Sequence, residues 1–548
     1  MKKITLLITT FNSLSQKTWV YLKDSGFLVD VVYALNKEQI INEINIFNPD
    51  AIFAPFLKKF VPKEIYEQYP TFILHPGPIG DKGAYALEHA IWEDKKYWGV
   101  IIFKATEEFD SGDIYSFEEF RVKSKTKSAL YRNELSDAAF IAIKRFFSNY
   151  YNLQIIKQPN TPIHSPITQK EIKINWQKDT TKEIIKKINT LDSYPGVRDK
   201  ILGVEVELFG AWEEEKLGGN SSILPKSIIA KRDGAICLKT VDKGVWISHL
   251  KEPNSFKLPA TYVLKDRLKG VKENRLPLIF DRSYKTFYEI SCDIKDEVAY
   301  LYFNFLNGAF RAEQCIRLKY AIEYLKERVK CIVLMGGEQF FSNGINLNIL
   351  EDSQKQGEDG WSNINAINEL IESVLFASSV VTISFLNKNA GAGGVFLATA
   401  CDFVLAKENV VLNPHYKTIG LSGSEYHTYT LPKRVGKDMA DKFLNECLPI
   451  SSSFAKDIGL VDEIVDSKEQ LEEFAKSKIE EDFFDDFIWG KEDFLEENIE
   501  KIKQFKEREL KIMYNEFWDE DSPFHKLRKD FVYKVCPTVT PKRLKFKS

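Results

Sequence analysis

The sequence predicts a multidomain α/β protein, and three observations support this fold class. The chain has 548 residues, which is too many for one hydrophobic core, since domains usually hold roughly 100–200 residues. Short apolar runs alternate with longer mixed segments in the N-terminal quarter and again from residue 285 onward. The region between them has closely spaced short apolar runs and turn residues. We therefore expect two α/β parts separated by a small β part.

The first α/β part has five expected strands, separated by lengths that fit helices or loops: 3–11, 27–35, 50–56, 71–77 and 98–106. This spacing favours a mostly parallel sheet. Ligands of such sheets bind beyond the carboxyl ends of the strands. His75 and Asp110 follow two of these strands, which makes them candidates for a site.

A linker rich in Pro, Asn and Thr (157–168) precedes the β part, whose turn signals (LGV, RDGA, DKG) suggest a small β-barrel or meander. Further strands of the second α/β part are expected at 297–304, 330–337, 378–386 and 401–406, with a helix at 312–329. The remainder, from about residue 468, is charged and aromatic with helical periodicity. It ends in a basic tail.

Composition and spacing exclude several classes of protein. Lys and Arg number 76 against 79 Asp and Glu, for a net charge of −3, so the overall charge gives no case for binding nucleic acid or an anionic membrane. The seven cysteines form no CxxC pair, which argues against a zinc ribbon or a disulfide framework, and we expect no metal centre. No segment is apolar enough to span a membrane. A cytoplasmic location is expected.

His75 and Asp110 suggest acyl-transfer chemistry. A histidine oriented by a carboxylate can shuttle a proton and stabilise a tetrahedral oxyanion. The alternative is a turn histidine with a capping aspartate, which is common near Gly and Pro. The segment FILHPGPIGDKG (72–83) with the later Asp-Ser-Gly of 110–112 resembles the formyltransferases that use formyl-tetrahydrofolate.

That resemblance covers roughly residues 1–275, and residues 170–197 resemble the start of the C-terminal domain of methionyl-tRNA formyltransferases. It implies that His75 and Asp110 are catalytic. One position departs from the pattern, because Ile73 stands where the family has its catalytic asparagine. Asn12, at the end of the first expected strand, is a candidate to replace it.

A glycine cluster, AGAGGVFLATACD (390–402), indicates a second candidate site. Together with FFSNGINLNIL (340–350) it resembles the oxyanion loops of the crotonase (enoyl-CoA hydratase/isomerase) superfamily, over about residues 285–468. The resemblance implies that the N–H groups of Gly393 and Ile345 bind a thioester oxygen. Hydratases of the superfamily carry glutamates where this chain has Phe396 and His415, so hydration is disfavoured.

New polar candidates occur in the same region: His415, Tyr416, Glu425, Tyr426 and His427. We favour Tyr416 and Glu425 as the acid and base, in either order, because they flank the segment that normally carries the family's acids. A carboxylate in an apolar pocket beside Phe396 would have a raised pKa and be a better base. The alternative is a degenerate crotonase fold that serves only as a scaffold.

A formyltransferase part joined to a crotonase part resembles the HypX/HoxX-type hydrogenase maturation proteins almost end to end. This implies formyl transfer from formyl-tetrahydrofolate to coenzyme A, followed by decarbonylation of formyl-CoA, which supplies carbon monoxide to the iron of [NiFe]-hydrogenase. Candidate CoA-binding residues are Gln16, Arg132 and Arg543, whose alternative role is ordinary surface charge. Hydrogenase maturation proteins are candidate partners.

Four domains are expected on this basis: a Rossmann-like formyltransferase domain (1–165), a small β-barrel like the formyltransferase C-terminal domain (166–280), a crotonase domain (281–468) and a helical C-terminal extension (469–548). Two other functions stay open. One is formyl transfer to an amine, with the crotonase part as a scaffold. The other is a non-enzymatic folate- or CoA-binding scaffold for hydrogenase maturation.

Overall fold

The structure is a computed structural model that describes residues 1–219 and 222–547. The chain divides into two compact units. Unit 1 comprises Met1–Arg275, Asp281–Phe287 and the C-terminal residues from Pro537, and unit 2 comprises Leu276–Phe280 and Tyr288–Cys536. Each unit is described by itself.

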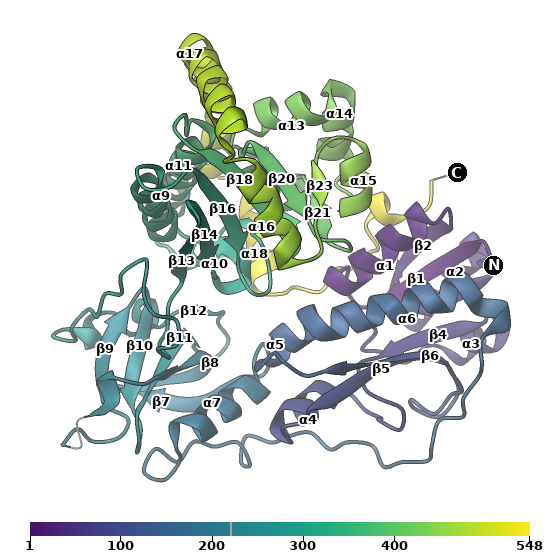
Figure 1. Ribbon diagram of the computed structural model, residues 1–548. Helices are drawn as coiled ribbons and strands as arrows, with labels where there is room; N and C mark the ends of the chain where they lie inside the picture. The colour runs from purple at the N-terminus through teal and green to yellow at the C-terminus, as the bar shows by residue number, and fades with distance from the viewer. Residues whose placement is uncertain (220–221, 548) are drawn as a thin grey trace. The chain divides into compact units, whose positions relative to one another are not determined.

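Unit 1 begins with a six-stranded sheet in the order β2-β1-β3-β4-β5-β6 (Figure 1). Strands β1 (Lys3–Ile8), β2 (Leu28–Tyr33), β3 (Ala51–Ala54) and β4 (Thr71–His75) are parallel, while β5 (Tyr97–Lys104) and β6 (Ile114–Arg121) are antiparallel. The five strands predicted from the apolar runs are confirmed. Helix α6 (Ser136–Asn149) packs along β5 and β6, and α1 (Ser13–Asp24) follows β1.

The second sheet of unit 1 is antiparallel, in the order β7-β8-β11-β10-β9, with β12 (Leu258–Pro259) beside β11. Its strands are β7 (Val197–Ile201), β8 (Val204–Glu214), β9 (Ile228–Arg232), β10 (Ala235–Lys239) and β11 (Gly244–Lys251). The predicted turn signals account for two hairpins. Leu202-Gly203 and Asp233-Gly234 both have positive φ at each central residue, as a type I′ turn requires.

Unit 2 contains a sheet in the order β13-β14-β16-β18-β20-β23. Only β13 (Ile290–Lys295) is antiparallel; the others are β14 (Val298–Phe303), β16 (Cys331–Gly336), β18 (Val381–Leu386), β20 (Phe403–Ala406) and β23 (Glu463–Ile464). Two small sheets accompany it. One pairs β15 (Ala309–Phe310) with β17 (Gly344–Ile345), and the other has the order β19 (Ala390–Gly391), β21 (Val411–Asn413) and β22 (Ile450–Ser451). Helices α9 (Ala312–Lys326) and α11 (Gln356–Leu375) pack on each other.

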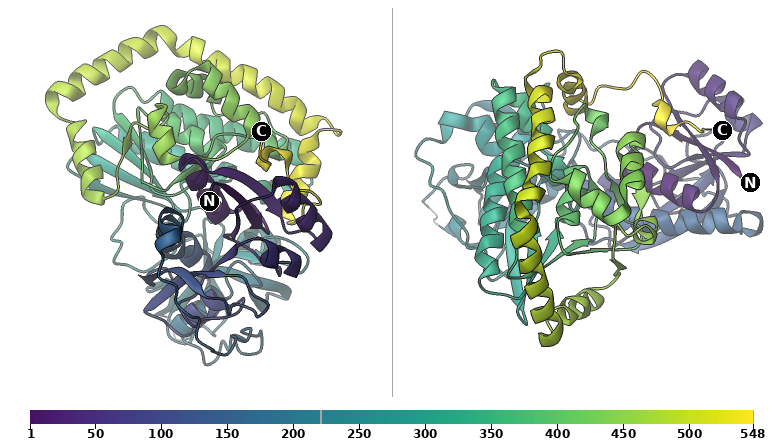
Figure 2. Two further views of the ribbon diagram at one scale, coloured as in Figure 1. Left: turned by 90° about the vertical axis from the view of Figure 1, so that its right-hand side faces the viewer. Right: turned by 90° about the horizontal axis from the view of Figure 1, so that it is seen from above.

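The C-terminal extension of unit 2 is helical, with α16 (Lys468–Ser477), α17 (Glu481–Trp518) and α18 (Pro523–Val532). Figure 2 shows that α17 is long and bent, and it packs on α11 and α13 (His427–Val435). None of the helices in the described ranges has the length and apolar character needed to cross a membrane. The seven cysteines are free thiols.

Candidate active sites

His75 stands at the end of β4, the edge of a parallel sheet at which ligands bind. Its Nε2 lies 2.6 Å from Asp81 Oδ2, and its Nδ1 lies 3.6 Å from Asp110 Oδ2. All three side chains are buried. The structure therefore brings His75 and Asp110 close together, as the sequence suggested, and adds Asp81. Carboxylates beside both ring nitrogens orient an imidazole that can pass a proton.

The glycine-rich turn after β4 makes this arrangement possible. A Cβ at Gly77 would lie 2.2 Å from Asp81 Oδ2, so only glycine lets that carboxylate fold back under the ring. Asp110 Oδ2 accepts a hydrogen bond from the Gly83 N–H at 2.9 Å. Sequence reasoning missed Asp81, although an acid six residues after the histidine in the same turn was visible.

The position of the missing asparagine is apolar, since Ile73 packs against the core around Ile101, Phe103 and Ile114. Asn12, the candidate to replace this asparagine, caps helix α1 in the structure. Its side-chain oxygen accepts from Ser15 N as the cap of α1, and its Nδ2 donates to the Tyr131 hydroxyl at 2.8 Å.

The three candidate CoA-binding residues gather around the turn between β1 and α1. Gln16 donates its side-chain N–H to Phe11 O at 2.9 Å. Arg543 lies near the phenol of Tyr33; burial raises the pKa of that phenol, and the charge of Arg543 and a hydrogen bond from the Phe11 backbone oppose the shift. Arg132 interacts electrostatically with the phenol of Tyr131, which accepts a hydrogen bond from Asn12 in this turn.

Sequence reasoning missed a half-buried cation, Lys257, next to Arg132. Burial lowers the pKa of Lys257 to about 8, against the attraction of Asp192, whose Oδ1 lies 3.7 Å from Lys257 Nζ. Burial also lowers the pKa of Arg132, again opposed by Asp192. The carboxylate of Asp192 thus stands opposite two half-buried cations. A surplus of positive charge of this kind fits an anionic ligand.

In unit 2, the two glycine loops meet backbone to backbone. Gly393 is the first residue of α12 (Gly393–Thr399), where a helical N–H has no acceptor within the helix. A Cβ at Gly344 would lie 3.1 Å from Gly393 N. Ile345 follows Gly344 in the two-residue strand β17. The two main-chain positions expected to form an oxyanion hole therefore belong to adjoining segments.

Glu425 lies directly over this junction, because a Cβ at Gly393 would be only 2.3 Å from Glu425 Oε1. Tyr416 donates its hydroxyl to Glu425 Oε2 at 2.7 Å, and Ser424 N–H donates to the same oxygen at 3.0 Å. Burial raises the pKa of Glu425 to about 7, although the Tyr416 hydrogen bond opposes the shift. Burial also raises the pKa of Tyr416 well above its usual value.

Aromatic rings enclose this acid pair. Phe396 is fully buried, and its ring stacks on Tyr416 with centroids 5.2 Å apart. The ring of His427 lies 5.3 Å from that of Phe396, and burial lowers the pKa of His427. Tyr426, another polar candidate, donates its hydroxyl to Glu372 at 2.6 Å, whereas Tyr416 donates to Glu425. The hydroxyl that donates to Glu425 therefore belongs to a ring packed between Phe396 and His427.

The backbone that carries Glu425 is strained and held from two sides. Glu425 and Tyr426 have φ values of 63° and 58°, which non-glycine residues rarely adopt. Asn368 on α11 accepts from Glu425 N at 3.2 Å. Glu509 on α17 accepts from Tyr426 N at 3.0 Å and from Thr428 N at 2.8 Å. Sequence reasoning missed Glu509, which was visible only as an acid within an otherwise apolar row of a long helix.

The family matches of the chain agree with its division into two compact units. Residues 30–145 match the formyl transferase family, 166–267 the formyl transferase C-terminal domain, and 294–482 the enoyl-CoA hydratase/isomerase family. The hydrogenase maturation factor HoxX of Bradyrhizobium diazoefficiens is 33% identical over 98% of this chain and 96% of its own. The chain belongs to the HypX/HoxX family of hydrogenase maturation factors.

A crystal structure of HypX from Aquifex aeolicus in complex with tetrahydrofolic acid has a TM-score of 0.95 to this structure and 38% sequence identity, and the similarity covers 99% of this chain and 98% of that chain. The methionyl-tRNA formyltransferase of Fervidobacterium nodosum is 24% identical over 40% of this chain and 72% of its own. For this HypX/HoxX-family protein, the predicted fold class is confirmed. The roles of the site residues and the domain boundaries stay predictions.

Proposed function

We propose that this HypX/HoxX-family protein makes carbon monoxide in two steps. Unit 1 would transfer the formyl group of formyl-tetrahydrofolate to coenzyme A, and unit 2 would split formyl-CoA into carbon monoxide and CoA. The observation that carries the proposal is the hydrogen-bonded pair of Tyr416 and Glu425 beside Gly393. It replaces the two glutamates of a hydratase with one base and one acid.

In the first step, His75 is suited to take the proton of the attacking thiol. The bond between the formyl carbon and the folate nitrogen breaks, and that nitrogen is protonated. Asp81 and Asp110 would keep the imidazole oriented throughout. The relative from Aquifex aeolicus was solved with tetrahydrofolic acid, which supports a folate as the formyl donor.

The cations of unit 1 fit the phosphates of coenzyme A. Arg132 and Lys257 are half-buried opposite one carboxylate, Asp192, and a bound phosphate would compensate the remaining positive charge. Gln16 and Arg543 lie at the β1–α1 turn, where the N-terminus of α1 also favours an anion. We propose these four residues as the binding set for the nucleotide.

In the second step, the only C–H bond of the formyl thioester lies on the carbonyl carbon. Glu425 would remove this proton, and the carbon–sulfur bond would break to leave carbon monoxide. Tyr416 would protonate the departing thiolate. Because Tyr416 already donates to Glu425, the proton taken by Glu425 can return to the phenol. The cycle consumes no proton, and the N–H groups of Gly393 and Ile345 would hold the carbonyl oxygen.

Phe396 explains why hydrolysis would not compete. Water would attack the same carbonyl carbon, and a buried aromatic ring against Tyr416 removes room for it. An acid at this position, as in hydratases, would bring water instead. The chemistry of the pocket therefore favours elimination over addition.

The decisive experiment supplies formyl-tetrahydrofolate and coenzyme A and detects carbon monoxide by its binding to haemoglobin. We expect carbon monoxide from the wild-type protein, and formyl-CoA without carbon monoxide from Glu425→Gln and Tyr416→Phe. A His75→Gln variant should make neither product but should still split added formyl-CoA. A formylated amine without carbon monoxide would instead support the amine transferase, and binding without turnover would support the scaffold.

A further inference from the structure

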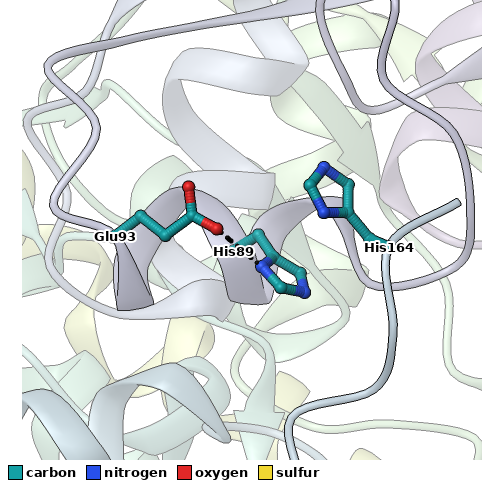
Figure 3. A group of neighbouring side chains, drawn as sticks. All are labelled: His89, Glu93 and His164. Atoms are coloured by element: carbon teal, nitrogen blue, oxygen red, sulfur yellow. Dashed lines mark hydrogen bonds and ion pairs between the residues drawn. The ribbon is translucent and has the colours of Figure 1, made fainter. Parts of the chain in front are cut away.

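Two histidines and a glutamate gather in unit 1 apart from the formyl-transfer histidine. His89 lies on α4 (Ala86–Trp92) and Glu93 ends that helix, while His164 belongs to the segment that follows η2 (Tyr150–Asn152). Figure 3 shows His164 on the neighbouring loop, beside His89. One ligand atom from each of the three residues lies within 4.8 Å of the other two. We propose that these residues bind a divalent first-row transition metal ion such as Zn²⁺.

The hydrogen bonds of His89 leave its Nδ1, the nitrogen that faces Glu93, as the ligand atom for a metal. Its Nε2 lies 2.9 Å from Ser165 O, and a carbonyl oxygen only accepts, so Nε2 carries a hydrogen. Its Nδ1 lies 2.9 Å from Glu93 Oε1. Without a metal, only a doubly protonated ring satisfies both oxygens. A divalent cation in place of the Nδ1 proton satisfies the same carboxylate and leaves the Ser165 contact intact.

The Nε2 of His164, like that of His89, lies beside an oxygen that can accept its hydrogen, here a buried carboxylate oxygen. His164 Nε2 lies 2.9 Å from Asp81 Oδ1, and this buried oxygen has no aligned hydrogen-bond donor among the described residues. Metal-binding histidines almost always donate their second N–H to a carboxylate or a backbone carbonyl. The backbone carbonyl of Ser165 is this partner for His89, and the carboxylate of Asp81 is this partner for His164. A turn of the His164 ring that aligns Nε2–H with Asp81 leaves Nδ1 as the ligand atom.

The donor set defines the class of ion. Two imidazole nitrogens and one carboxylate oxygen suit zinc and its neighbours and are poor ligands for Mg²⁺ or Ca²⁺. Three protein ligands leave a fourth position for water. The ligand atoms lie within 4.8 Å of one another, whereas the ligand atoms of a tetrahedral zinc lie about 3.3 Å apart. His164 can close this gap because its segment has no regular secondary structure.

The site reaches the formyl-transfer histidine through Asp81. One oxygen of this carboxylate lies beside His164, and the other lies 2.6 Å from His75 Nε2. A metal ion would therefore fix the 153–168 segment on α4 and hold Asp81 in the orientation that His75 uses. This makes His164 a positioning residue. Metal binding itself does not depend on the proposed formyl transfer.

The test uses the full chain after treatment with a chelator. We expect about one Zn²⁺ per chain by isothermal titration calorimetry, and a visible absorption band when Co²⁺ takes its place. Glu93→Gln and His164→Ala should each weaken binding about tenfold or more. The control is His525→Ala, because His525 is a half-buried histidine of unit 2 whose Nε2 lies 3.0 Å from Asp519 O. This variant should bind Zn²⁺ as the wild type does.

The proposal is overturned if the wild-type chain binds no Zn²⁺ or if Glu93→Gln and His164→Ala bind it as tightly as His525→Ala does. Thermal unfolding of each apo variant shows whether it has folded. Glu93 is exposed, so its variant keeps the test valid even if His164→Ala is destabilised. None of these measurements uses a formyl donor, so their outcome is separate from that of the carbon monoxide assay.

Discussion

A methyl group added at Gly393 would displace the carboxylate that we assign as the base. The added Cβ would lie 2.3 Å from Glu425 Oε1, well inside van der Waals contact. We expect Gly393→Ala to slow carbon monoxide release from formyl-CoA about 100-fold, the size of a lost general base. Formyl-CoA formation should not change. Both rates can be followed in one assay by quenching and chromatography.

The matched control is Gly490→Ala. Gly490 lies in α17, and a Cβ there meets nothing within 4 Å. Alanine in a helix interior should stabilise the protein by about 1 kcal/mol without changing either rate. If Gly393→Ala released carbon monoxide as fast as Gly490→Ala, Glu425 would not act at this position.

The raised pKa of Glu425 predicts a pH dependence of the second step. A base must be ionised, so carbon monoxide release from formyl-CoA should fall as the pH drops below about 7, the pKa to which burial raises Glu425. The formyl-transfer step should not follow this curve. A rate that stays constant from pH 8 to pH 5.5 would contradict the assignment.

The raised pKa of Glu425 also predicts that the free energy of unfolding changes with pH. Its folded pKa lies above the unfolded value, so folding favours the protonated form and stability is lost as the pH rises from about 4.5 to about 7. Glu425→Gln removes this loss. Between pH 5 and pH 8, the free energy of unfolding of the variant should rise by about 2 kcal/mol relative to that of the wild type. Urea unfolding at the two pH values measures it.

At the scale of the elements, helix α17 holds the loop that carries the proposed base, Glu425, through Glu509. Glu509→Gln should leave one of the N–H groups of Tyr426 and Thr428 without an acceptor, at a cost of about 1–3 kcal/mol. It also removes a negative charge that raises the pKa of Glu425. The pH midpoint of carbon monoxide release should therefore shift downward. A purely structural role would lower the rate without moving the midpoint.

Glu500→Gln on the same helix is the control, because Glu500 is exposed and pairs only with Lys503 in the described contacts. Its pH midpoint should equal that of the wild type. If both variants behave alike, α17 does not tune Glu425.

The elements themselves were largely predictable from the sequence, whereas their contacts were not. An apolar run and a glycine turn predict the strand that ends at His75. They also predict the position of Asp110, which follows the next strand, β5. Asp81 was missed because its contact depends on a backbone that folds back at Gly77. Glu509 was missed because it lies 84 residues beyond Glu425, on a helix whose partner only the tertiary structure reveals.

At the scale of the whole molecule, the proposed function would place the producer and the consumer of the same reactive thioester on one chain. A single chain gives the second site an effective concentration of intermediate that separate proteins lack. We test this by mixing Glu425→Gln, which keeps the first site, with His75→Gln, which keeps the second. At micromolar protein, the mixture should release carbon monoxide about tenfold more slowly than the wild type, and the rate per molecule should rise with concentration. A mixture as fast as the wild type would show that formyl-CoA leaves one site and diffuses freely to the other.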